Sequence, residues 1–351
     1  MKRLKAQASA EQTVDLARLA EIVEQFRDKR VVLYGDFVAD EFQYGDISRV
    51  SREAPVLILK HKETRLVPGG GANATNNLAA LGANVMPVTV VGKDAAGEAL
   101  AEYFDGLHVD TSGIVRLANW TTPTKTRFLA GWAHTTAQQV LRVDREPRES
   151  LPEKVHTQLA NKLFSKLRKA DALAISDYGF GAATPESVLL AAKKLRKKIP
   201  ITLDARHGLT RYAVSAVVSA TPNEAELEAL HHTAIGKNVA ELERCGRATL
   251  AAMKMNSLLV TRGRDGMALF EKEAKRFTQI PMHGSDQAVD VTGAGDTVLA
   301  AYTLALASGA SSLEAAHIAN IAGGLVVMKR GTATVSQAEL LETIRREISG
   351  S

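Results

Sequence analysis

Short runs of β-branched and other apolar residues recur along the chain, and stretches with helical periodicity separate most of them. The runs expected to form strands are residues 31–35, 85–91, 171–176, 200–204, 214–219 and 257–261. Before the first run, apolar residues at helical spacing over residues 11–30 predict an amphipathic helix. Strands that alternate with helices are typical of parallel strands joined by helical crossovers. The pattern therefore predicts a doubly wound, mainly parallel α/β sheet.

Two stretches depart from this alternation, residues 42–68 and residues 108–146. Both contain strand-like segments, such as 56-VLILK-60 and 124-TKTRFLA-130, with no helical segment between them. We expect these segments to pair as a small antiparallel sheet that forms a lid over one end of the domain. Lids of this kind exclude water from a reaction.

Two segments in the C-terminal third, residues 297–308 and 313–329, are apolar on nearly every side. A helix that is hydrophobic all round is normally buried. We therefore expect both helices to pack against the sheet. There is no internal repeat, low-complexity tract or linker, so we expect one domain over residues 1–351, with residues 1–29 as an N-terminal helical extension.

Composition places the chain among ordinary globular proteins. Of its 351 residues 45% are hydrophobic and 24% are charged, which is enough to bury a full core. Cys245 is the single cysteine, which excludes an intramolecular disulfide and a cysteine-based zinc cluster. A reducing compartment fits this usage best, so we expect a cytoplasmic protein.

Charge and hydropathy narrow the possible partners. No run approaches the ~18 apolar residues of a membrane span, and the basic start lacks the apolar segment of a secretory signal. The formal net charge is +5, but the basic residues are scattered and only 5% of residues are aromatic. We therefore expect neither a membrane nor a nucleic acid as partner, and at most a small anionic ligand.

The segment 290-DVTGAGDTVLAA-301 carries the clearest chemical signal. Gly293, Ala294 and Gly295 open a long helix, so their N–H groups are unshielded by side chains and are supported by the helix dipole, as in an anion-binding site. Asp296 follows at once, where a carboxylate can take a proton from an attacking hydroxyl. A plain turn with a dipole-complementing Asp is the alternative, but the long pattern favours catalysis.

Two further segments carry polar residues suited to a polyol. In 68-PGGGANATNN-77 a glycine turn enters a helix that begins with Asn73, whose amide can both donate to and accept from sugar hydroxyls. A tight strand-to-helix connection explains this segment equally well. In 35-GDFVAD-40, Asp36 and Asp40 follow the first strand, where open α/β sheets bind ligands. Turn capping is the alternative, more so for Asp36 than for Asp40.

Two other segments fit a nucleotide and its metal. In 221-TPNEAELEAL-230, Asn223 and Glu226 lie on one helix face, where their oxygens can hold hydrated Mg²⁺ beside phosphates or simply cap the helix. Gly263 and Gly266 in 261-TRGRDGM-267 suit a nucleotide phosphate or a hairpin. The sequence has no G-x-G-x-x-G, P-loop, H-E-x-x-H or G-x-S-x-G motif, which disfavours dinucleotide-binding proteins, P-loop proteins, metallohydrolases and α/β-hydrolases.

The chain resembles the PfkB/ribokinase-like family of carbohydrate kinases across residues 30–345. The resemblance rests on five motifs that occur in this order: GDxxxD, PGGGAN, TPNEAE, TRGxxG and DVTGAGD. This resemblance implies a three-layer αβα fold with a β-sheet lid, and an ATP-dependent sugar kinase. Within the family, residues 45–59, 122–127, 138–146 and 331–336 are similar to D-glycero-β-D-manno-heptose-7-phosphate kinases, which make a precursor of ADP-heptose and of the lipopolysaccharide core. The H-x-G-H nucleotidyltransferase motif that usually accompanies them is absent, so we expect the kinase alone.

The resemblance also implies roles for individual residues. Asp296 would be the catalytic base and Gly293, Ala294 and Gly295 the anion hole. The sugar phosphate would contact Asp36, Asp40, Gly70, Gly71, Asn73, Lys125, Arg127, Arg142 and Asp144, with the three basic residues near its distal phosphate. ATP would lie near Asn223, Thr261, Gly263, Gly266, Asn320 and Gly324. Glu226 would be associated with Mg²⁺, and Asp290, Thr292, Gly331 and Ser336 with a monovalent cation such as K⁺. Lids of this type resemble ones that pair in a homodimer.

Two positions depart from the heptose kinase pattern. Where those kinases read S-D-Y-x-K-G and D-P-K-G, this sequence has 176-SDYGFG-181 and 204-DARHG-208. Phe180 and Arg206 thus stand in place of two lysines, and of the two only Arg206 can bind phosphate. The alternatives are a kinase of this family for another sugar or sugar phosphate, of the ribose or fructose type, and a non-catalytic sugar-binding protein on the same fold.

Overall fold

A nine-stranded sheet forms the centre of the molecule, in the order β13-β12-β11-β10-β9-β8-β1-β4-β5. The computed structural model describes residues 14–107, 109–132, 137–214, 216–284 and 288–350. The strands are β1 (Arg30–Gly35), β4 (Asn84–Gly92), β5 (Ile114–Leu117), β8 (Ala172–Asp177), β9 (Ile201–Ala205), β10 (Ser219–Ala220), β11 (Ser257–Thr261), β12 (Met267–Glu271) and β13 (Thr278–Ile280). All neighbours from β5 to β11 are parallel, whereas β12 and β13 add an antiparallel edge.

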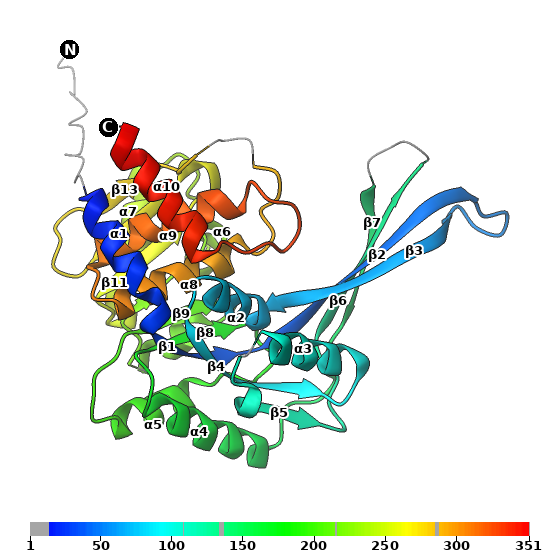
Figure 1. The fold of residues 1–351 in the computed structure, drawn as a ribbon, viewed down its shortest axis with the longest axis horizontal. Helices are drawn as coiled ribbons and strands as arrows, with labels where there is room; N and C mark the ends of the chain where they lie inside the picture. Colours follow the sequence, from blue (N-terminus) through cyan, green and yellow to red (C-terminus); the bar gives the residue numbers. More distant parts are fainter. Residues whose placement is uncertain (1–13, 108, 133–136, 215, 285–287, 351) are drawn as a thin grey trace.

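Helices cover both faces of this sheet, so its central strands are apolar on both sides (Figure 1). Val31 and Leu33 of β1 contribute to one buried cluster, and Val32 and Tyr34 to the other. On the first face pack α1 (Leu16–Glu24), α2 (Gly71–Ala80), α3 (Ala95–Gly106), α8 (Ala294–Ala307), α9 (Ser312–Val326) and α10 (Gln337–Gly350). On the second face pack α4 (Glu153–Leu167), α5 (Pro185–Lys194), α6 (Glu224–His231) and α7 (Val239–Met253).

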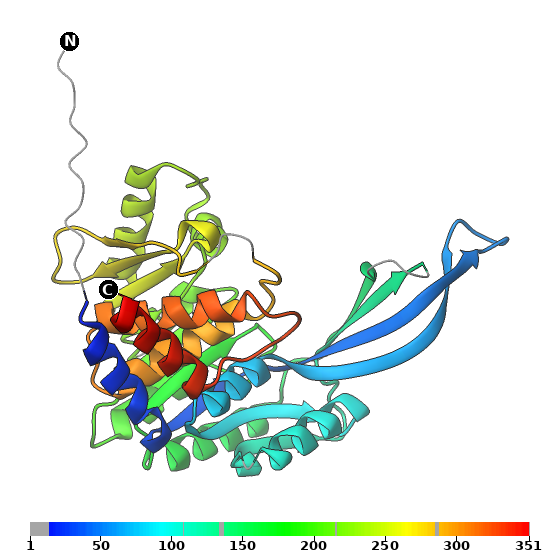
Figure 2. The same ribbon diagram turned by 45° about the horizontal axis from the view of Figure 1, so that its top comes forward.

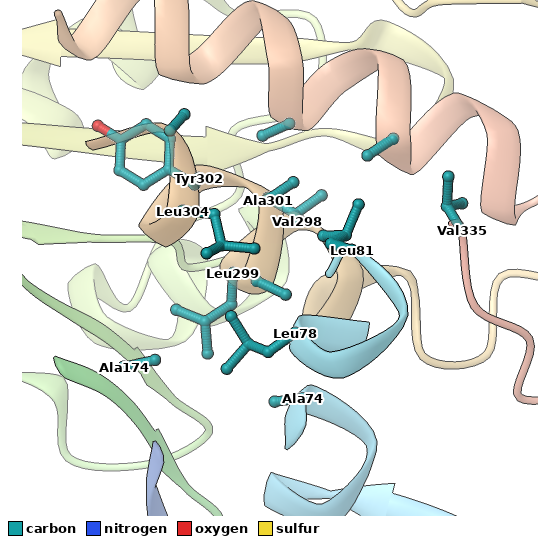
Figure 3. Close-up of a cluster of buried hydrophobic side chains, with 14 of the residues drawn as sticks. Ala74, Leu78, Leu81, Ala174, Val298, Leu299, Ala301, Tyr302, Leu304 and Val335 are labelled. Carbon is teal, nitrogen blue, oxygen red and sulfur yellow. The ribbon is translucent and has the colours of Figure 1, made fainter. Parts of the chain in front are cut away.

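The N-terminal half of α8 is held by α2 and the sheet. Figure 3 shows Leu78 of α2 beside Leu299 of α8, and Leu81, which directly follows α2, beside Val298. Ala174 of β8 belongs to the same buried cluster. Every labelled side chain of this cluster is buried, which explains why the segment is apolar all round. The packing fixes the start of α8 relative to α2 and β8.

The lid is a separate four-stranded sheet in the order β3-β2-β6-β7. It comprises β2 (Phe37–Val50), β3 (Leu57–Gly70), β6 (Thr124–Gly131) and β7 (Gln138–Arg145). Its far end projects well away from the body (Figures 1 and 2). Because β2 continues from β1 after a single residue, the lid is anchored at the carboxyl edge of the main sheet.

The structure confirms the predicted alternation and corrects its details. The expected lid is present, but β2 and β6 pair in parallel, so it is not a purely antiparallel sheet. Residues 114–117 were expected in the lid, yet they form β5 and pair with β4, because α3 returns the chain to the edge of the main sheet.

Local boundaries also differ. Residues 214–219 were expected as one strand, but η3 (Leu209–Val214) packs against α7 and leaves only Ser219–Ala220 as β10. Within residues 11–30 the helix is α1, followed by the 3-10 helix η1 (Gln25–Asp28), and residues 1–13 lie outside the described part. Both C-terminal helices are present as α8 and α9. None of the helices in the described ranges is long and apolar enough to cross a membrane.

Candidate active site

A cavity of about 810 Å³ lies between the lid and the carboxyl ends of the parallel strands. Residues at or just after the ends of β8, β9, β10 and β11 line it, as expected for the crevice at the carboxyl edge of an open α/β sheet. Many of the residues singled out in the sequence meet here. They are Asp40, Gly70, Asn73, Lys125, Arg127, Asn223, Glu226, Thr261, Thr292, Gly293, Gly295 and Asp296.

Asp296 lies in the first turn of α8 and is almost fully buried, with 4% of its surface exposed. Two side chains from other elements contact its two carboxylate oxygens. Nδ2 of Asn73 in α2 donates to Oδ2 at 2.7 Å, and the hydroxyl of Tyr178, which follows β8, donates to Oδ1 at 3.3 Å. Each oxygen keeps a second lone pair, so the carboxylate can still accept a proton from a ligand in the cavity.

The environment of Asp296 suits a general base. Burial, together with the nearby Asp40 carboxylate, raises the pKa of Asp296 to about 7, although the hydrogen bonds from Asn73 and Tyr178 and the charge of Lys125 act in the opposite direction. General bases work best when their pKa lies near the operating pH. A proton can therefore be gained and lost here at neutral pH.

The predicted anion cradle is located at the start of α8. Gly293 is the N-cap residue with φ +80°, and a Cβ there would come within 2.5 Å of Nδ2 of Asn73. A Cβ on Gly295 would meet only Asp204 at 3.9 Å, so the cavity reaches the backbone at this point. Ala294 donates its N–H to the carbonyl of Val291 at 3.3 Å, whereas first-turn N–H groups of a helix that lack such a partner point toward a ligand at its start.

The lid supplies charged side chains to the opposite wall. Nη1 of Arg127 in β6 and Oδ1 of Asp40 in β2 form an ion pair at 2.5 Å, and both residues are largely buried. Lys125 precedes Arg127 by two positions, so both side chains lie on the same face of the lid. Desolvation, reinforced by the charge of Arg206, lowers the pKa of Lys125. An anion bound at this wall would relieve the repulsion between these cations.

Asp36 has a different environment from Asp40. Its carboxylate accepts the backbone N–H groups of Tyr178, Phe180 and Ala182 at 2.8–3.0 Å, and it is not among the residues that line the cavity. Burial and the charge of Asp177 raise its pKa to about 6. In the described arrangement Asp36 therefore holds the loop after β8, which in turn presents Tyr178 to Asp296.

Gly70 shows why the turn before α2 is rich in glycine. Its φ is +54°, and a Cβ there would lie 2.9 Å from Val38 and 3.2 Å from the ring of Tyr178. Gly71 donates its N–H to the carbonyl of Asp36, and a Cβ on it would lie 2.9 Å from that oxygen. The turn thus brings α2, and with it Asn73, against the loop that carries Tyr178.

Asn223 and Glu226 form a capping box at the start of α6. The Asn223 side chain accepts from the backbone of Glu226, and the Glu226 carboxylate accepts from the backbone of Asn223 at 3.0 Å through Oε2. The capping alternative is thus present. Both residues also line the cavity, and burial raises the pKa of Glu226. A carboxylate whose charge is disfavoured by burial is stabilised by a bound cation, so Glu226 is suited to one.

Asp204 and Tyr178 are cavity residues that the sequence did not single out. Asp204 lies near the end of β9, and burial together with the charges of Glu226 and Asp296 raises its pKa well above the usual value. The signal that was available is position, because each residue lies at or just beyond the end of a predicted parallel strand. Arg206, noted in the sequence as a replacement for lysine, also lines the cavity.

The residues expected at a monovalent cation lie on two neighbouring loops. The Asp290 carboxylate accepts the N–H of Thr292 at 2.9 Å and that of Gly331 at 3.0 Å, which joins the loops. Ser336 caps α10, since its hydroxyl oxygen accepts the backbone N–H of Glu339 at 3.2 Å. Asp290 also keeps a low pKa, mainly because these backbone hydrogen bonds outweigh partial burial. The Asp290 carboxylate supplies the oxygen ligands that a hard cation requires, and the monovalent cation site with Thr292, Gly331 and Ser336 stays a prediction.

The expected nucleotide residues divide into two groups. Thr261 lines the cavity at the end of β11, and Gly263 begins the 3-10 helix η4 (Gly263–Asp265) beside it. Gly266, Asn320 and Gly324 lie outside the cavity lining but touch one segment. The Asn320 amide donates to the carbonyl of Pro281 at 2.8 Å, and a Cβ on Gly266 or Gly324 would collide with the backbone of residues 280–283. These three residues position that segment.

Arg142 and Asp144 of β7 also lie outside the cavity lining. They hydrogen-bond to each other through two contacts of 2.9 and 3.1 Å. In the sheet register Arg142 is opposite Arg127, and Asp144 is opposite Lys125. They therefore extend the charged face of the lid beyond the cavity.

The fold and this site together define a class, the carbohydrate kinases with a β-sheet lid. The model of the pfkB family of carbohydrate kinases matches residues 28–339, and the chain belongs to this family. It has the ribokinase-like α/β fold and is a sugar kinase.

The comparisons identify particular relatives. The chain is 37% identical over 329 residues to the "Bifunctional protein HldE" of Geobacter metallireducens, and 36% identical over 319 residues to that of Desulfatibacillum aliphaticivorans. These alignments cover 93% and 91% of this chain but only 65% and 63% of the relatives.

Solved structures show the same fold at lower identity. Phosphofructokinase-2 of Escherichia coli in complex with potassium is 20% identical, with a TM-score of 0.71 over 92% of this chain and 99% of that one. Arabidopsis thaliana ribokinase complexed with ribose and ATP is 21% identical, with a TM-score of 0.67 over 90% and 99%.

Proposed function

We propose that this kinase transfers the γ-phosphoryl group of ATP to the anomeric hydroxyl of D-glycero-β-D-manno-heptose 7-phosphate, giving the 1,7-bisphosphate. The observation that carries the proposal is the position of Asp296. Its carboxylate lies at the start of α8, beside the glycine cradle and inside a cavity whose other wall is cationic. The chemistry of phosphoryl transfer requires these three groups together.

In the proposed reaction Asp296 accepts the proton of the anomeric hydroxyl as the sugar oxygen bonds to the γ-phosphorus. The bond from that phosphorus to the bridging oxygen breaks, and ADP leaves. The amides of residues 293–295 would form the anion hole for the charge on the transferred group, and positioning supplies most of the rate enhancement. Mg²⁺ associated with Glu226 would neutralise nucleotide phosphate charge, and a monovalent cation such as K⁺ would stabilise the loop of Asp290 and Thr292.

The distal phosphate of the substrate is assigned to the cationic face of the lid. Lys125 and Arg127 line the cavity, and Arg142 is opposite Arg127 in the next strand. Arginine and lysine on one sheet face can hold a phosphate by several charge-assisted hydrogen bonds. Asp40, which pairs with Arg127, is left to bind sugar hydroxyls from the same face.

The resemblance of residues 45–59, 122–127, 138–146 and 331–336 to heptose 7-phosphate kinases supports the heptose substrate, and the curated relatives share the name HldE. Those relatives are called bifunctional, and this chain matches only about two thirds of their length, so the proposal concerns the kinase reaction alone. Kinases for ribose or fructose phosphates remain the alternative, but the solved structures with those names share the fold at only 20–21% identity.

A coupled ADP-release assay over matched sugars tests the substrate. Heptose 7-phosphate, heptose without phosphate, fructose 6-phosphate and ribose are offered at equal concentrations with Mg²⁺ and ATP. We expect heptose 7-phosphate to give the highest kcat/KM, and Arg127→Gln to lower this value more than it lowers the value for unphosphorylated heptose. A higher kcat/KM for any other sugar would reject the heptose assignment, and binding without turnover would favour a sugar-binding protein.

We also propose that the protein is a homodimer, and the lid supports this proposal. A cytoplasmic location is proposed on the cysteine usage alone. The outer half of the lid exposes Leu57, Val140 and Leu141, which are 42–55% exposed. They line a hollow of about 550 Å³ together with Tyr44 and Phe128. A two-sided sheet that projects from the body with apolar residues exposed is well suited to pairing with a second copy.

A further inference from the structure

Tyr178 is the residue through which three parts of the cavity meet. It follows β8, and its backbone N–H is held by the buried carboxylate of Asp36 at 2.9 Å. Its ring packs beside Gly70, where a Cβ would come within 3.2 Å. The phenol is therefore fixed at both ends, by the loop behind it and by the turn that leads into α2.

The hydroxyl and the ring of Tyr178 make different contacts. The hydroxyl donates to Oδ1 of Asp296 at 3.3 Å. The Nζ atom of Lys125 lies 5.4 Å from the ring centre, and the guanidinium carbon of Arg206 lies 5.9 Å from it. Cations within about 6 Å of a ring centre are attracted to its face. One side chain thus touches the base and two of the cations of the cavity.

We propose that Tyr178 is a positioning residue of the phosphoryl transfer, whose hydroxyl orients the Asp296 carboxylate and whose ring seats Lys125 and Arg206 at the edge of the same cavity. The inference rests on the proposed kinase reaction. In that reaction Tyr178 neither gains nor loses a proton. Its hydroxyl keeps its hydrogen and stabilises the ionised form of Asp296, while Asn73 holds the other oxygen.

The electrostatics around Tyr178 agree with a permanent donor. Burial, with the charges of Asp296 and Asp204, raises its pKa well above the usual value, so the phenol stays protonated. Four charged groups surround Asp296 in the cavity, and they come from three strands or their ends: Asp40 of β2, Lys125 of β6, Asp204 of β9 and Arg206 after it. Of these groups only the two cations favour the ionised form of Asp296. Loss of the hydrogen bond from the Tyr178 hydroxyl should therefore raise the pKa of Asp296 measurably.

Kinetics of Tyr178→Phe and Tyr178→Leu separate the two roles. Phe removes the hydroxyl and keeps the ring, so we expect kcat to fall roughly tenfold, KM values to stay within about twofold, and the acidic limb of kcat/KM to move up by roughly 0.5–1 pH unit. Leu removes the ring as well and should raise the KM for the sugar phosphate about fivefold or more. Tyr103→Phe is the matched control, because its hydroxyl binds Asn76 outside the cavity.

A stability measurement tests the same contact without turnover. The unfolding free energy is measured for the wild-type protein, Tyr178→Phe, Asp296→Asn and the double variant at pH 5.5 and 8.5. A hydrogen bond to a carboxylate is stronger than one to its neutral form. We expect the Tyr178→Phe penalty to be larger at pH 8.5 than at pH 5.5 when Asp296 is present, and to be independent of pH in the Asp296→Asn background.

The two experiments distinguish the possible failures. If the wild-type protein phosphorylates no sugar but the stability penalty depends on pH as expected, the proposed function fails and the contact between Tyr178 and Asp296 stands. A penalty that is equal at both pH values in the wild-type background overturns the proposal. So does a Tyr178→Phe enzyme with unchanged kcat and an unmoved acidic limb.

Discussion

Asn73 of α2 and Asp296 of α8 are 223 positions apart in the chain, yet Nδ2 of Asn73 lies 2.7 Å from Oδ2 of Asp296. Asn73 is fully buried, and its own side-chain oxygen accepts from Asn77 at 3.2 Å. Thr297, the neighbour of Asp296, donates to Asn77 in turn at 2.8 Å. The amide expected to bind sugar is therefore one member of a network that fixes the carboxylate.

Replacing Asn73 by Ala should lower kcat more than it changes affinity. Loss of a hydrogen bond to a buried charged group costs about 1.5–3 kcal/mol. If this loss is felt in the transition state, kcat falls roughly 10- to 100-fold. Steady-state kinetics check the prediction, with Asn76→Ala on the same helix as the control, since Asn76 accepts from Tyr103 instead. Equal kcat values for Asn73→Ala and the wild-type protein would contradict it.

The activity should rise with pH through neutrality. Because Asp296 has a pKa of about 7 and acts only when ionised, kcat/KM should increase roughly tenfold per pH unit below that value and level off above it. A pH profile from 5 to 9 at constant ionic strength measures this. A flat profile between pH 5 and 8 would show that no group with this pKa serves as the base.

The same group should make the protein less stable at high pH. The folded-state pKa of Asp296, about 7, lies above its ordinary value of 3.8, so the folded state binds the proton more tightly than the unfolded state. Stability is therefore greatest below pH 4 for this group and is lost as the pH rises toward 7. Asp36, with a pKa of about 6, acts in the same direction.

Asp296→Asn isolates the contribution of Asp296. At pH 8 the variant should unfold at a higher temperature than the wild-type protein, by roughly 2–4 °C for each kcal/mol gained. At pH 5 the difference should be smaller, and it should vanish below pH 4, where Asp296 is neutral in both the folded and the unfolded protein. Differential scanning calorimetry of both proteins without ligands checks this. If the difference in unfolding temperature between the variant and the wild-type protein is the same at pH 8 and at pH 5, the prediction is refuted.

A charge on the outer lid should separate the proposed dimer. Leu141 is 55% exposed, lies in the apolar hollow of the lid and does not line the cavity. Burying an Asp there would be unfavourable by several kcal/mol, so Leu141→Asp should sediment as a monomer. Analytical ultracentrifugation at micromolar concentration measures this, with the exposed Leu190→Asp on α5 as the control. A wild-type protein that is monomeric would reject the dimer.

The sequence predicted most of the fold because buried strands and helices have a recognisable pattern of apolar residues. Strands covered on both faces, such as β1 and β8, are continuous apolar runs, and α8 and α9 are apolar all round. The lid was harder to predict, since its strands pair by a parallel contact between β2 and β6 that no local pattern specifies. The division of residues 108–146 between the main sheet and the lid depends on α3, and it too follows from tertiary packing.

For the candidate site, the sequence predicted the segments that line the cavity better than it predicted the contacts of each side chain. Asp296 and its glycine cradle could be predicted because helix starts have a local signature. Asp and Asn are common ligands of sugars, so the sequence indicated Asp36 and Asn73 as sugar ligands. Only the fold shows that Asp36 holds the loop after β8 and that Asn73 holds the Asp296 carboxylate. No local sequence motif marks Tyr178 and Asp204, and they line the cavity because of the order of the strands in the sheet.

The measurement that tests the central claim most directly is the turnover of Asp296→Asn beside its nucleotide affinity. We expect kcat with heptose 7-phosphate to fall by on the order of a hundredfold or more, because Asp296 is the acidic residue that the first turn of α8 presents to the cavity. ATP binding, followed by calorimetry, should stay within about threefold of wild type. Turnover at the wild-type rate in this variant would contradict the assignment of Asp296 as the base.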